Sequence, residues 1–212
     1  MSRKVGIVRF LGTNCDLDIW QAVEAVEQKP NWLWYQDRFE SNSVEAIIIP
    51  GGFSYGDYLR AGALAAKSPV MDSVREAASK GVPILGICNG FQVLCESGLL
   101  PGALVQNTNR RFIDEWSELK LEGANSYWGS SYKASDSISL PIAHGEGRFY
   151  AEESLLKEVE DKNQVWWRYA DNPNGSLNDI AGVTSEDGKV AGLMPHPERA
   201  LFEWMQGTDG LS

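Results

Sequence analysis

Gly86-Ile87-Cys88-Asn89-Gly90-Phe91-Gln92 decides the fold of this sequence, because it places a cysteine where a buried strand turns into a helix. The apolar run before it, 82–85, is typical of a strand, and the apolar residues after it suit one side of a helix. Small residues two positions before and two positions after the cysteine relieve the crowding at such a sharp turn. The stretch is therefore predicted to be a strand-to-helix elbow with Cys88 at its tip.

Cys88 at the start of that helix has the environment of a reactive thiol. The helix dipole and the free backbone N–H groups at a helix N-terminus favour thiolate over thiol. The N–H of Asn89 can point at an oxyanion that forms on an attacked carbonyl. The alternative is a small structural cysteine, because a free cysteine is usually a buried hydrophobe. The flanking Gly86 and Gly90 favour the nucleophile over this alternative.

Around the elbow, short apolar runs alternate with segments of helical periodicity. Continuously apolar strands separated by helices indicate a parallel sheet covered on both faces, whereas the later, alternating segments predict antiparallel strands at one side. The fold class is therefore α/β, a mostly parallel sheet flanked by helices on both faces with extra antiparallel strands, in a single domain spanning 1–212. The expected strands are 5–10, 32–36, 46–50, 83–88, 118–122, 137–140, 180–183 and 189–194, and the expected helices are 16–28 (capped by Thr13-Asn14), 70–80 and 152–160.

Composition and charge restrict the function classes. The 212-residue chain has a formal charge of -10 and a pI near 4.7, which argues against a nucleic-acid partner bound through phosphates. No apolar stretch approaches the length that crosses a membrane, and the first strand starts almost at Met1, so we expect a cytoplasmic protein. The three cysteines lack the spacing of a disulfide framework or a zinc site, so we expect no metal.

The loop after the third expected strand carries several glycines. In parallel sheets ligands collect at the carboxyl ends of the strands, and this strand ends in Pro50-Gly51-Gly52-Phe53-Ser54-Tyr55-Gly56-Asp57-Tyr58. Because glycine lets backbone amides approach a ligand, Gly52 could supply a second oxyanion donor beside Asn89. A simple turn is the alternative. The loop is not a phosphate-binding P-loop, since no Gly-Lys-Ser/Thr follows.

A thiolate nucleophile usually needs a base, and His196 lies in Met194-Pro195-His196-Pro197-Glu198-Arg199, just after an expected strand. Pro197 favours extended backbone at His196. Residues two apart in an extended chain face the same side, so the side chains of His196 and Glu198 are expected to project together. The carboxylate could then hold one imidazole nitrogen while the other faces Cys88.

The second histidine, His144, lies in Ala143-His144-Gly145-Glu146-Gly147. Its neighbouring glycines indicate a close-packed loop near a site or an interface. The segment lacks the orienting geometry expected at His196, so His144 is the weaker candidate for the base. A structural histidine is the alternative at both positions.

Taken together, these motifs resemble the class I (triad) glutamine amidotransferases. The resemblance rests on Cys88 in its elbow, on the Pro-His-Pro-Glu segment at 195–198, and on the Pro-Gly-Gly-Phe-Ser-Tyr-Gly-Asp loop at 50–57. The branch of that family that serves purine biosynthesis shows further similarity at 143–147, 172–176 and 194–200. The family pattern also predicts a final helix after about residue 210, whereas this sequence ends at residue 212.

The resemblance implies a role for each candidate residue. Cys88 would attack the side-chain amide carbon of glutamine, His196 would shuttle protons, and Glu198 would orient His196. Hydrolysis of the resulting thioester would complete the conversion of glutamine to glutamate and ammonia. The oxyanion would be held by the amides of Gly52 and Asn89.

Gln92, one helical turn after the nucleophile, matches the family position that helps to hold the amino-acid end of glutamine. Its alternative is a polar residue that faces solvent. In the family, ammonia passes to a larger synthetase subunit that uses ATP to convert formylglycinamide ribonucleotide to the amidine, and a small third subunit often bridges the two. ATP and Mg are therefore expected in the synthetase, with no cofactor in this chain and no nucleic-acid or membrane partner.

Two other functions fit the same residues. One is another Cys/His hydrolase of the same fold, such as a peptidase or a gamma-glutamyl hydrolase. The other is a non-catalytic docking subunit that kept the fold. Gln92 and the Gly-Gly-Phe-Ser-Tyr loop favour free glutamine as the substrate, and we expect low activity of the chain without its synthetase.

Overall fold

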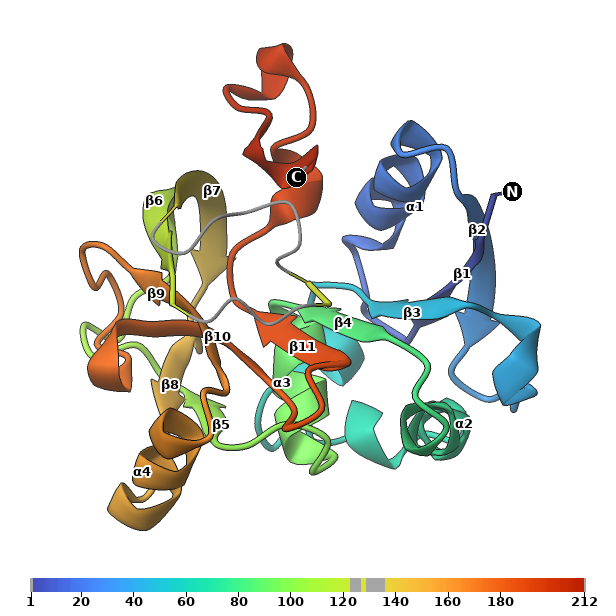
Figure 1. Cartoon of the computed structure of the whole chain (residues 1–212), viewed down its shortest axis with the longest axis horizontal. Coiled ribbons are helices and arrows are strands. Elements are labelled where there is room, and N and C mark those ends of the chain that lie inside the picture. The colour runs from blue at the N-terminus through green and yellow to red at the C-terminus, as the bar shows by residue number, and fades with distance from the viewer. Residues whose placement is uncertain (1, 123–126, 129–135, 212) are drawn as a thin grey trace.

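The structure, a computed structural model, describes residues 2–122, 127–128 and 136–211, and a mixed β-sheet forms its centre (Figure 1). Five neighbouring strands run parallel in the order β2, β1, β3, β4 and β11. Their bounds are Lys29–Trp34 for β2, Lys4–Arg9 for β1, Ala46–Ile49 for β3, Ile84–Ile87 for β4 and Val190–Leu193 for β11. The elbow at Cys88 thus follows a strand that has a parallel neighbour on each side.

Antiparallel strands extend the same sheet beyond β11, in the order β10, β9, β6 and β7. A separate pair, β5 and β8, lies beside this half. The bounds are Ile180–Thr184 for β10, Val165–Tyr169 for β9, Ile113–Leu121 for β6, Ser137–His144 for β7, Ala103–Val105 for β5 and Arg148–Tyr150 for β8. The antiparallel half therefore joins the parallel half where β10 pairs with β11, and β9, β6 and β7 follow beyond β10.

Helices cover both sides of the parallel strands, with α1 on one side and α2 and α3 on the other (Figure 1). The α-helices are α1 (Asp16–Ala25), α2 (Val70–Ser79), α3 (Asn89–Glu96) and α4 (Glu153–Asp161). Short 3-10 turns occur at Ser41–Ser43, Ser54–Asp57, Ala65–Lys67, Leu177–Asp179, Pro197–Arg199, Glu203–Met205 and Asp209–Leu211. Within the described ranges, no helix is long and apolar enough to span a bilayer.

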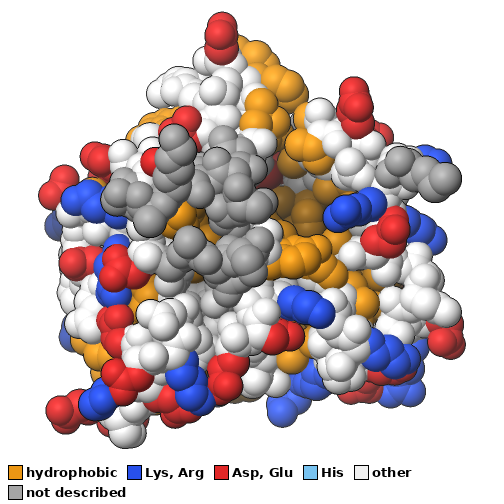
Figure 2. Space-filling view, in the orientation of Figure 1, with side chains coloured by type: hydrophobic (Ala, Val, Ile, Leu, Met, Phe, Trp, Pro, Cys, Tyr) orange, Lys and Arg blue, Asp and Glu red, His pale blue; other side chains and the backbone are white. Residues whose placement is uncertain are grey.

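The core lies between the sheet and its helices. Strand residues such as Ile7, Ile47 and Ile84 are fully buried, and burial of one such side chain contributes about 1.5–3 kcal/mol. Trp167 of β9 is the largest fully buried side chain among the described residues, so the aromatic stretch 166–169 belongs to the core. Figure 2 shows further hydrophobic side chains in a hollow of one face, surrounded by acidic and basic side chains.

Two local predictions are wrong. The second strand spans 29–34, whereas the sequence predicts 32–36; β2 is an edge strand paired with β1 alone, so its polar first half needs no apolar pattern. The first helix has Cys15 as its N-cap residue without a side-chain cap bond, whereas the sequence predicts a Thr13-Asn14 cap. The Thr13 hydroxyl instead accepts a hydrogen bond from the Phe10 N–H at 3.1 Å. The periodicity also leaves β5, β8 and β9 unpredicted.

Candidate active site

Cys88 occupies a strained turn between β4 and α3. Its backbone has φ 51° and ψ -107°, a conformation that a residue with a side chain rarely adopts. Its N–H donates to the Leu193 carbonyl at 2.8 Å, and its carbonyl accepts from the amides of Phe91 and Gln92 in the first turn of α3. Cys88 is therefore the N-cap residue of α3, with the positive end of the helix dipole at its side chain.

The glycines on each side of Cys88 are required by packing. A Cβ atom on Gly90 would lie 1.9 Å from the Ile49 carbonyl oxygen, and one on Gly86 would lie 2.5 Å from Leu94 Cδ1. Both distances are shorter than real Cβ contacts, so a larger residue would push α3 away from β3 and β4. The close approach of α3 to the strands places the thiol at the carboxyl edge of the sheet.

His196 and Glu198 follow β11 and are almost fully buried, with exposed fractions of 1% and 2%. The His196 Nδ1 atom lies 2.6 Å from Glu198 Oε1, and the His196 N–H donates to the Pro141 carbonyl of β7 at 2.8 Å. The side chains project together as expected, but the backbone is not extended: Pro197–Arg199 forms a 3-10 turn. The turn, rather than strand alternation, brings the carboxylate to the imidazole.

Cys88 and His196 meet across Gly51. A Cβ atom on Gly51 would lie 2.8 Å from His196 Cε1, 3.4 Å from Cys88 Cβ and 3.2 Å from Cys15 Sγ. The Cys88 thiol lies 3.7 Å from the Ala143 carbonyl oxygen, and the buried Nε2 atom of His196 has no hydrogen-bond partner. The structure thus brings the predicted nucleophile, base and orienting carboxylate together, with one imidazole nitrogen left for proton transfer.

The charges around His196 favour its protonated form. Burial by itself lowers the pKa of the imidazole, but the negative charges of Glu198 and Cys88 outweigh burial and raise that pKa above its ordinary value. The same environment therefore favours an imidazolium next to Cys88. An imidazolium there can supply the proton that a leaving amine needs.

Both predicted oxyanion donors lie beside the thiol. Gly52 lines the cavities next to Cys88 and has φ 132°, where a Cβ atom would lie 2.6 Å from the Asn14 nitrogen. Asn89 is the first residue of α3, so its N–H has no partner within the helix. Its side-chain oxygen accepts from the Ser54 N–H at 3.2 Å, which joins the glycine loop to the start of the helix.

Gln92 lines the site beside Cys88, and its side chain is buried away from solvent. It is 5% exposed, its side-chain oxygen accepts from Asn89 Nδ2 at 2.8 Å, and its side-chain nitrogen donates to the Glu146 carbonyl at 2.7 Å. The solvent-facing alternative for Gln92 is therefore wrong. Its amide connects α3 to the turn between β7 and β8, which forms one wall of the site.

Two cavities open on either side of Cys88 and share Gly52, Phe53, Cys88, Phe112 and Ala143. The base-side cavity, about 250 Å³, also contains Cys15, His196 and Arg199. The helix-side cavity, about 170 Å³, also contains Asp57, Gln92, His144 and Glu146. The nucleophile therefore borders two neighbouring cavities, one with the base and Asp114 and one with Asp57 and Glu146.

The sequence interpretation assigned no role to Cys15 and Arg199, which border the base. The Arg199 guanidinium donates to Cys15 Sγ at 3.0 Å, yet burial raises the pKa of the Cys15 thiol to about 12. Cys15 is therefore a neutral thiol at neutral pH and does not compete with Cys88 as a nucleophile. Its place in the segment between β1 and α1 was the signal available in the sequence.

His144 lines the helix-side cavity and packs against Gly147, where a Cβ atom would lie 2.3 Å from His144 Nδ1. Burial, assisted by the charge of His196, lowers the pKa of His144 to about 4. Its Nε2 atom lies 3.5 Å from the Asn174 side-chain nitrogen. These contacts fit a neutral histidine that supports the 144–147 turn.

Cys15, His196 and Glu198 are a possible metal-binding group, since one ligand atom from each lies within 4.8 Å of the others. Existing contacts oppose a cation there. The Arg199 guanidinium already binds the Cys15 sulfur, and Glu198 binds His196 Nδ1. The expectation of no metal in this chain stays a prediction.

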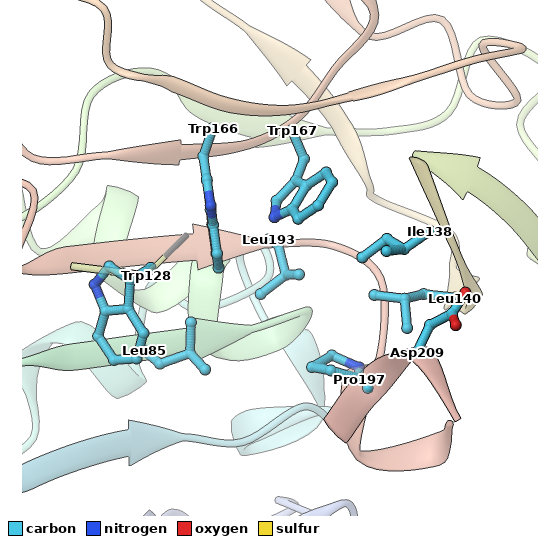
Figure 3. Close-up of a pocket in the computed structure, with 10 residues that line it drawn as sticks. Leu85, Trp128, Ile138, Leu140, Trp166, Trp167, Leu193, Pro197 and Asp209 are labelled. Atoms are coloured by element: carbon cyan, nitrogen blue, oxygen red, sulfur yellow. The ribbon is translucent and has the colours of Figure 1, made fainter. Parts of the chain in front are cut away.

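A third cavity, about 190 Å³, lies on the antiparallel side and is mainly apolar (Figure 3). Trp166, Trp167, Leu193 and Pro197 point toward it, and Asp209 lies at its edge. Among the residues that the structure describes, neither a cysteine nor a histidine lines this cavity. Its contribution to the site is indirect, because it borders the turn that follows His196.

A family model described as a CobB/CobQ-like glutamine amidotransferase domain matches residues 2–209. The chain belongs to this family of glutamine amidotransferases, and the α/β fold class predicted from the sequence is confirmed. It is 53% identical over 210 residues to the phosphoribosylformylglycinamidine synthase subunit PurQ of Trichormus variabilis, which covers 98% of this chain and 93% of the relative. The same values hold for the PurQ subunit of a Nostoc species.

Solved structures agree with this assignment. A chain in the structure of PurLQS from Thermotoga maritima superimposes with a TM-score of 0.92 at 42% identity, covering 100% of this chain and 95% of the other. A glutamine amidotransferase from Thermotoga maritima gives a TM-score of 0.62 at 18% identity, covering 93% of this chain and 77% of the other, and supports the fold alone. The resemblance read from the sequence motifs is confirmed.

Proposed function

We propose that this chain is the glutaminase subunit of a phosphoribosylformylglycinamidine synthase, and that it hydrolyses glutamine to glutamate and ammonia. One observation carries the proposal: a strained cysteine at a helix N-terminus lies beside a buried His–Glu pair. The relatives named PurQ support the same function at 53% identity over nearly the whole chain. Free glutamine is the proposed substrate.

Cys88 begins the proposed reaction as a thiolate. Its sulfur forms a bond to the side-chain carbonyl carbon of glutamine, and the negative charge moves to the carbonyl oxygen. The amides of Gly52 and Asn89 stabilise that oxyanion, and loss of one such donor typically costs about a hundredfold to a thousandfold in rate. When the tetrahedral intermediate collapses, the carbon–nitrogen bond breaks and a glutamyl thioester remains on Cys88.

His196 moves the protons in both halves of the reaction. Its imidazolium gives a proton to the leaving nitrogen, which departs as ammonia, and the neutral imidazole then takes a proton from the attacking water. The carbon–sulfur bond breaks, glutamate leaves and Cys88 returns to the thiolate. Glu198, 2.6 Å from the other imidazole nitrogen, fixes the ring orientation throughout.

The ammonia is used by a partner. We propose that a large synthetase subunit consumes it in an ATP- and Mg-dependent conversion of formylglycinamide ribonucleotide to the amidine, and that a small third subunit bridges the two. The structure named PurLQS contains a close relative of this chain, which supports a multi-subunit complex. We place the reaction in the cytoplasm and no resident cofactor in this chain.

Replacement of the nucleophile in the complex tests the proposed function. With its cognate synthetase, Cys88→Ala should lose amidine formation from glutamine and keep amidine formation from added ammonium salts, because only ammonia production requires the thiol. The measurement is product formation with each nitrogen source. Equal glutamine-dependent rates for Cys88→Ala and the unmodified chain would contradict the proposal.

The two other functions give different results in simple assays. A hydrolase of other substrates would form a thioester with gamma-glutamyl peptides and not with a glutamine analogue. A docking subunit without catalysis would release no glutamate from glutamine, with or without the synthetase.

A further inference from the structure

The glycine loop after β3, residues 50–57, and the residues just after it contain strained backbone. Tyr55, Asp57 and Leu59 have positive φ angles of 55°, 54° and 73°, although none of them is glycine. Residues with side chains rarely adopt such angles, and the angles persist only where surrounding contacts hold them. The loop also carries Gly52, one of the two oxyanion donors of the proposed reaction. Its contacts with the rest of the chain therefore decide where that donor lies.

The loop is held from two sides. On one side the segment 11–13 follows β1, and its carbonyls accept from the Phe53 and Tyr55 N–H groups at 3.1 and 2.6 Å. On the other side lies the start of α3, where Asn89 Oδ1 accepts from the Ser54 N–H at 3.2 Å. Ser54 and Asn89 are only 2% and 1% exposed, so both partners of this hydrogen bond are shielded from solvent. The Asn89 side chain thus joins the loop to the nucleophile helix.

Neighbouring groups fix which way the Asn89 amide points. The Glu146 carbonyl can only accept a hydrogen bond, and it accepts from Gln92 Nε2 at 2.7 Å. Gln92 Oε1 must then face Asn89, whose Nδ2 donates to it at 2.8 Å. That leaves Asn89 Oδ1 for the Ser54 N–H, which can only donate. The three hydrogen bonds therefore form a chain with one direction, between the β7–β8 turn and the glycine loop.

We propose that the Asn89 side chain positions the oxyanion hole, because it holds the loop that carries Gly52 at a fixed place beside α3. This inference rests on the proposed function. The Asn89 backbone N–H is itself one oxyanion donor, and Ser54 is only two residues from Gly52, the other donor. One residue therefore supplies the first donor with its backbone and sets the place of the second with its side chain.

Asn89 acts in this role through the loop and not through the substrate. Its side-chain oxygen and nitrogen already have protein partners in Ser54 and Gln92, with Asp57 Oδ1 a further 3.4 Å contact of the nitrogen. Loss of this side chain should therefore weaken only a step that builds negative charge on a carbonyl oxygen. Acylation of Cys88 by glutamine is such a step, whereas alkylation by iodoacetamide displaces iodide from carbon and forms no oxyanion.

Three variants of the full chain, each in complex with its synthetase, test the role of Asn89. Asn89→Leu removes the acceptor for the Ser54 N–H, and Asn89→Asp keeps an acceptor oxygen at that place. Gln164→Met is the matched control, because Gln164 is a buried amide that donates to the Thr184 carbonyl at 2.7 Å and lines neither cavity beside Cys88. The measurements are kcat for glutamine hydrolysis, the rate of Cys88 labelling by iodoacetamide, and urea unfolding.

Asn89→Leu should lower kcat by about tenfold to a hundredfold, because misplacement of a reacting group by about 1 Å can cost about a hundredfold. Its rate of iodoacetamide labelling should stay close to that of the unmodified chain. Asn89→Asp should keep a larger share of kcat than Asn89→Leu. Gln164→Met should lower the urea midpoint and leave kcat unchanged. If Asn89→Leu does not fold, Asn89→Ala makes the same comparison, since it also lacks the acceptor.

The outcomes separate this inference from the proposed function. The inference is wrong if Asn89→Leu keeps the unmodified kcat, or if it slows iodoacetamide labelling as much as hydrolysis, since Asn89 would then support the thiol and not the loop. It is also wrong if Asn89→Asp loses as much kcat as Asn89→Leu, because the contact with Gln92 would then be decisive. The glutaminase assignment stands in each case. Absence of glutamine hydrolysis by the unmodified complex would instead refute the proposed function, and the inference with it.

Discussion

Cys88 combines three local properties that rarely occur together: positive φ, burial and a helix N-terminus. The flanking glycines made this position recognisable in the sequence, because they relieve steric crowding that arises within the turn itself. His196 and Glu198 were recognisable for a related reason. They are separated by one residue, and Pro195 and Pro197 restrict the backbone on each side of His196. The reason given for their contact was nevertheless wrong, because the 3-10 turn at 197–199 depends on neighbours outside the motif.

Substitution of the base should cost more activity than substitution of its carboxylate. His196→Ala removes proton transfer and should lower kcat by about a hundredfold to ten-thousandfold. Glu198→Gln keeps a hydrogen-bond partner for the ring, so its loss should be smaller. Steady-state glutamine hydrolysis in the complex measures both, and the reverse order would contradict the assigned roles.

The pH profile of Glu198→Gln gives an independent check of the same prediction. Burial lowers the pKa of His196, and the charges of Glu198 and Cys88 raise it; loss of the Glu198 charge should therefore lower that pKa. The imidazolium then loses its proton at a lower pH, so the alkaline limb of kcat/KM should move to lower pH. An unmoved limb would show that Glu198 does not set the charge of His196.

At the scale of elements, the decisive contact is the approach of α3 to β3. Gly90 allows it, because a Cβ atom there would lie 1.9 Å from the Ile49 carbonyl oxygen. The glycine pattern of the elbow indicated this approach, but the partner strand could not be read from the sequence. Strand order is set by crossover connections and by packing over long sequence separations.

Gly90→Ala should destabilise the fold by about 2–3 kcal/mol, because α3 must move away from the sheet. Gly145→Ala is the matched control, since the nearest atom to its Cβ would be Phe112 Cδ2 at 3.8 Å, and it should change stability by about 0.5 kcal/mol or less. Urea unfolding followed by circular dichroism measures both. Equal free energies of unfolding for the two variants would mean that the close approach of α3 to β3 does not contribute to stability.

At the scale of the whole molecule, the site is formed by both halves of the sheet. The parallel half supplies Cys88, Gly52 and His196, whereas the antiparallel half supplies Ala143 and Glu146. The exposed Phe53 and Phe112 side chains, one from each half, lie together at the cavities with ring centroids 6.5 Å apart. A partner that contacts this rim could therefore change the oxyanion loop.

Synthetase binding is expected to raise glutamine turnover by the chain. Ammonia made without an acceptor is wasted, and the Gly-rich loop that carries Gly52 can be repositioned by docking. Because one oxyanion donor is worth about a hundredfold to a thousandfold in rate, a small loop movement suffices for that control. Glutamate release with and without the synthetase measures the effect, and equal turnover in both states would refute it.

The sequence by itself determined the elbow, most of the strands and helices, and the candidate residues Cys88, His196 and Glu198, because each rests on steric or spacing rules within a few residues. Only the tertiary structure decided that the turn between β7 and β8 forms a wall of the site, that Gln92 is buried, and that Asp57 and Glu146 share one cavity. Those contacts join segments far apart in the chain. Their geometry follows from sheet order and core packing, which no local pattern encodes.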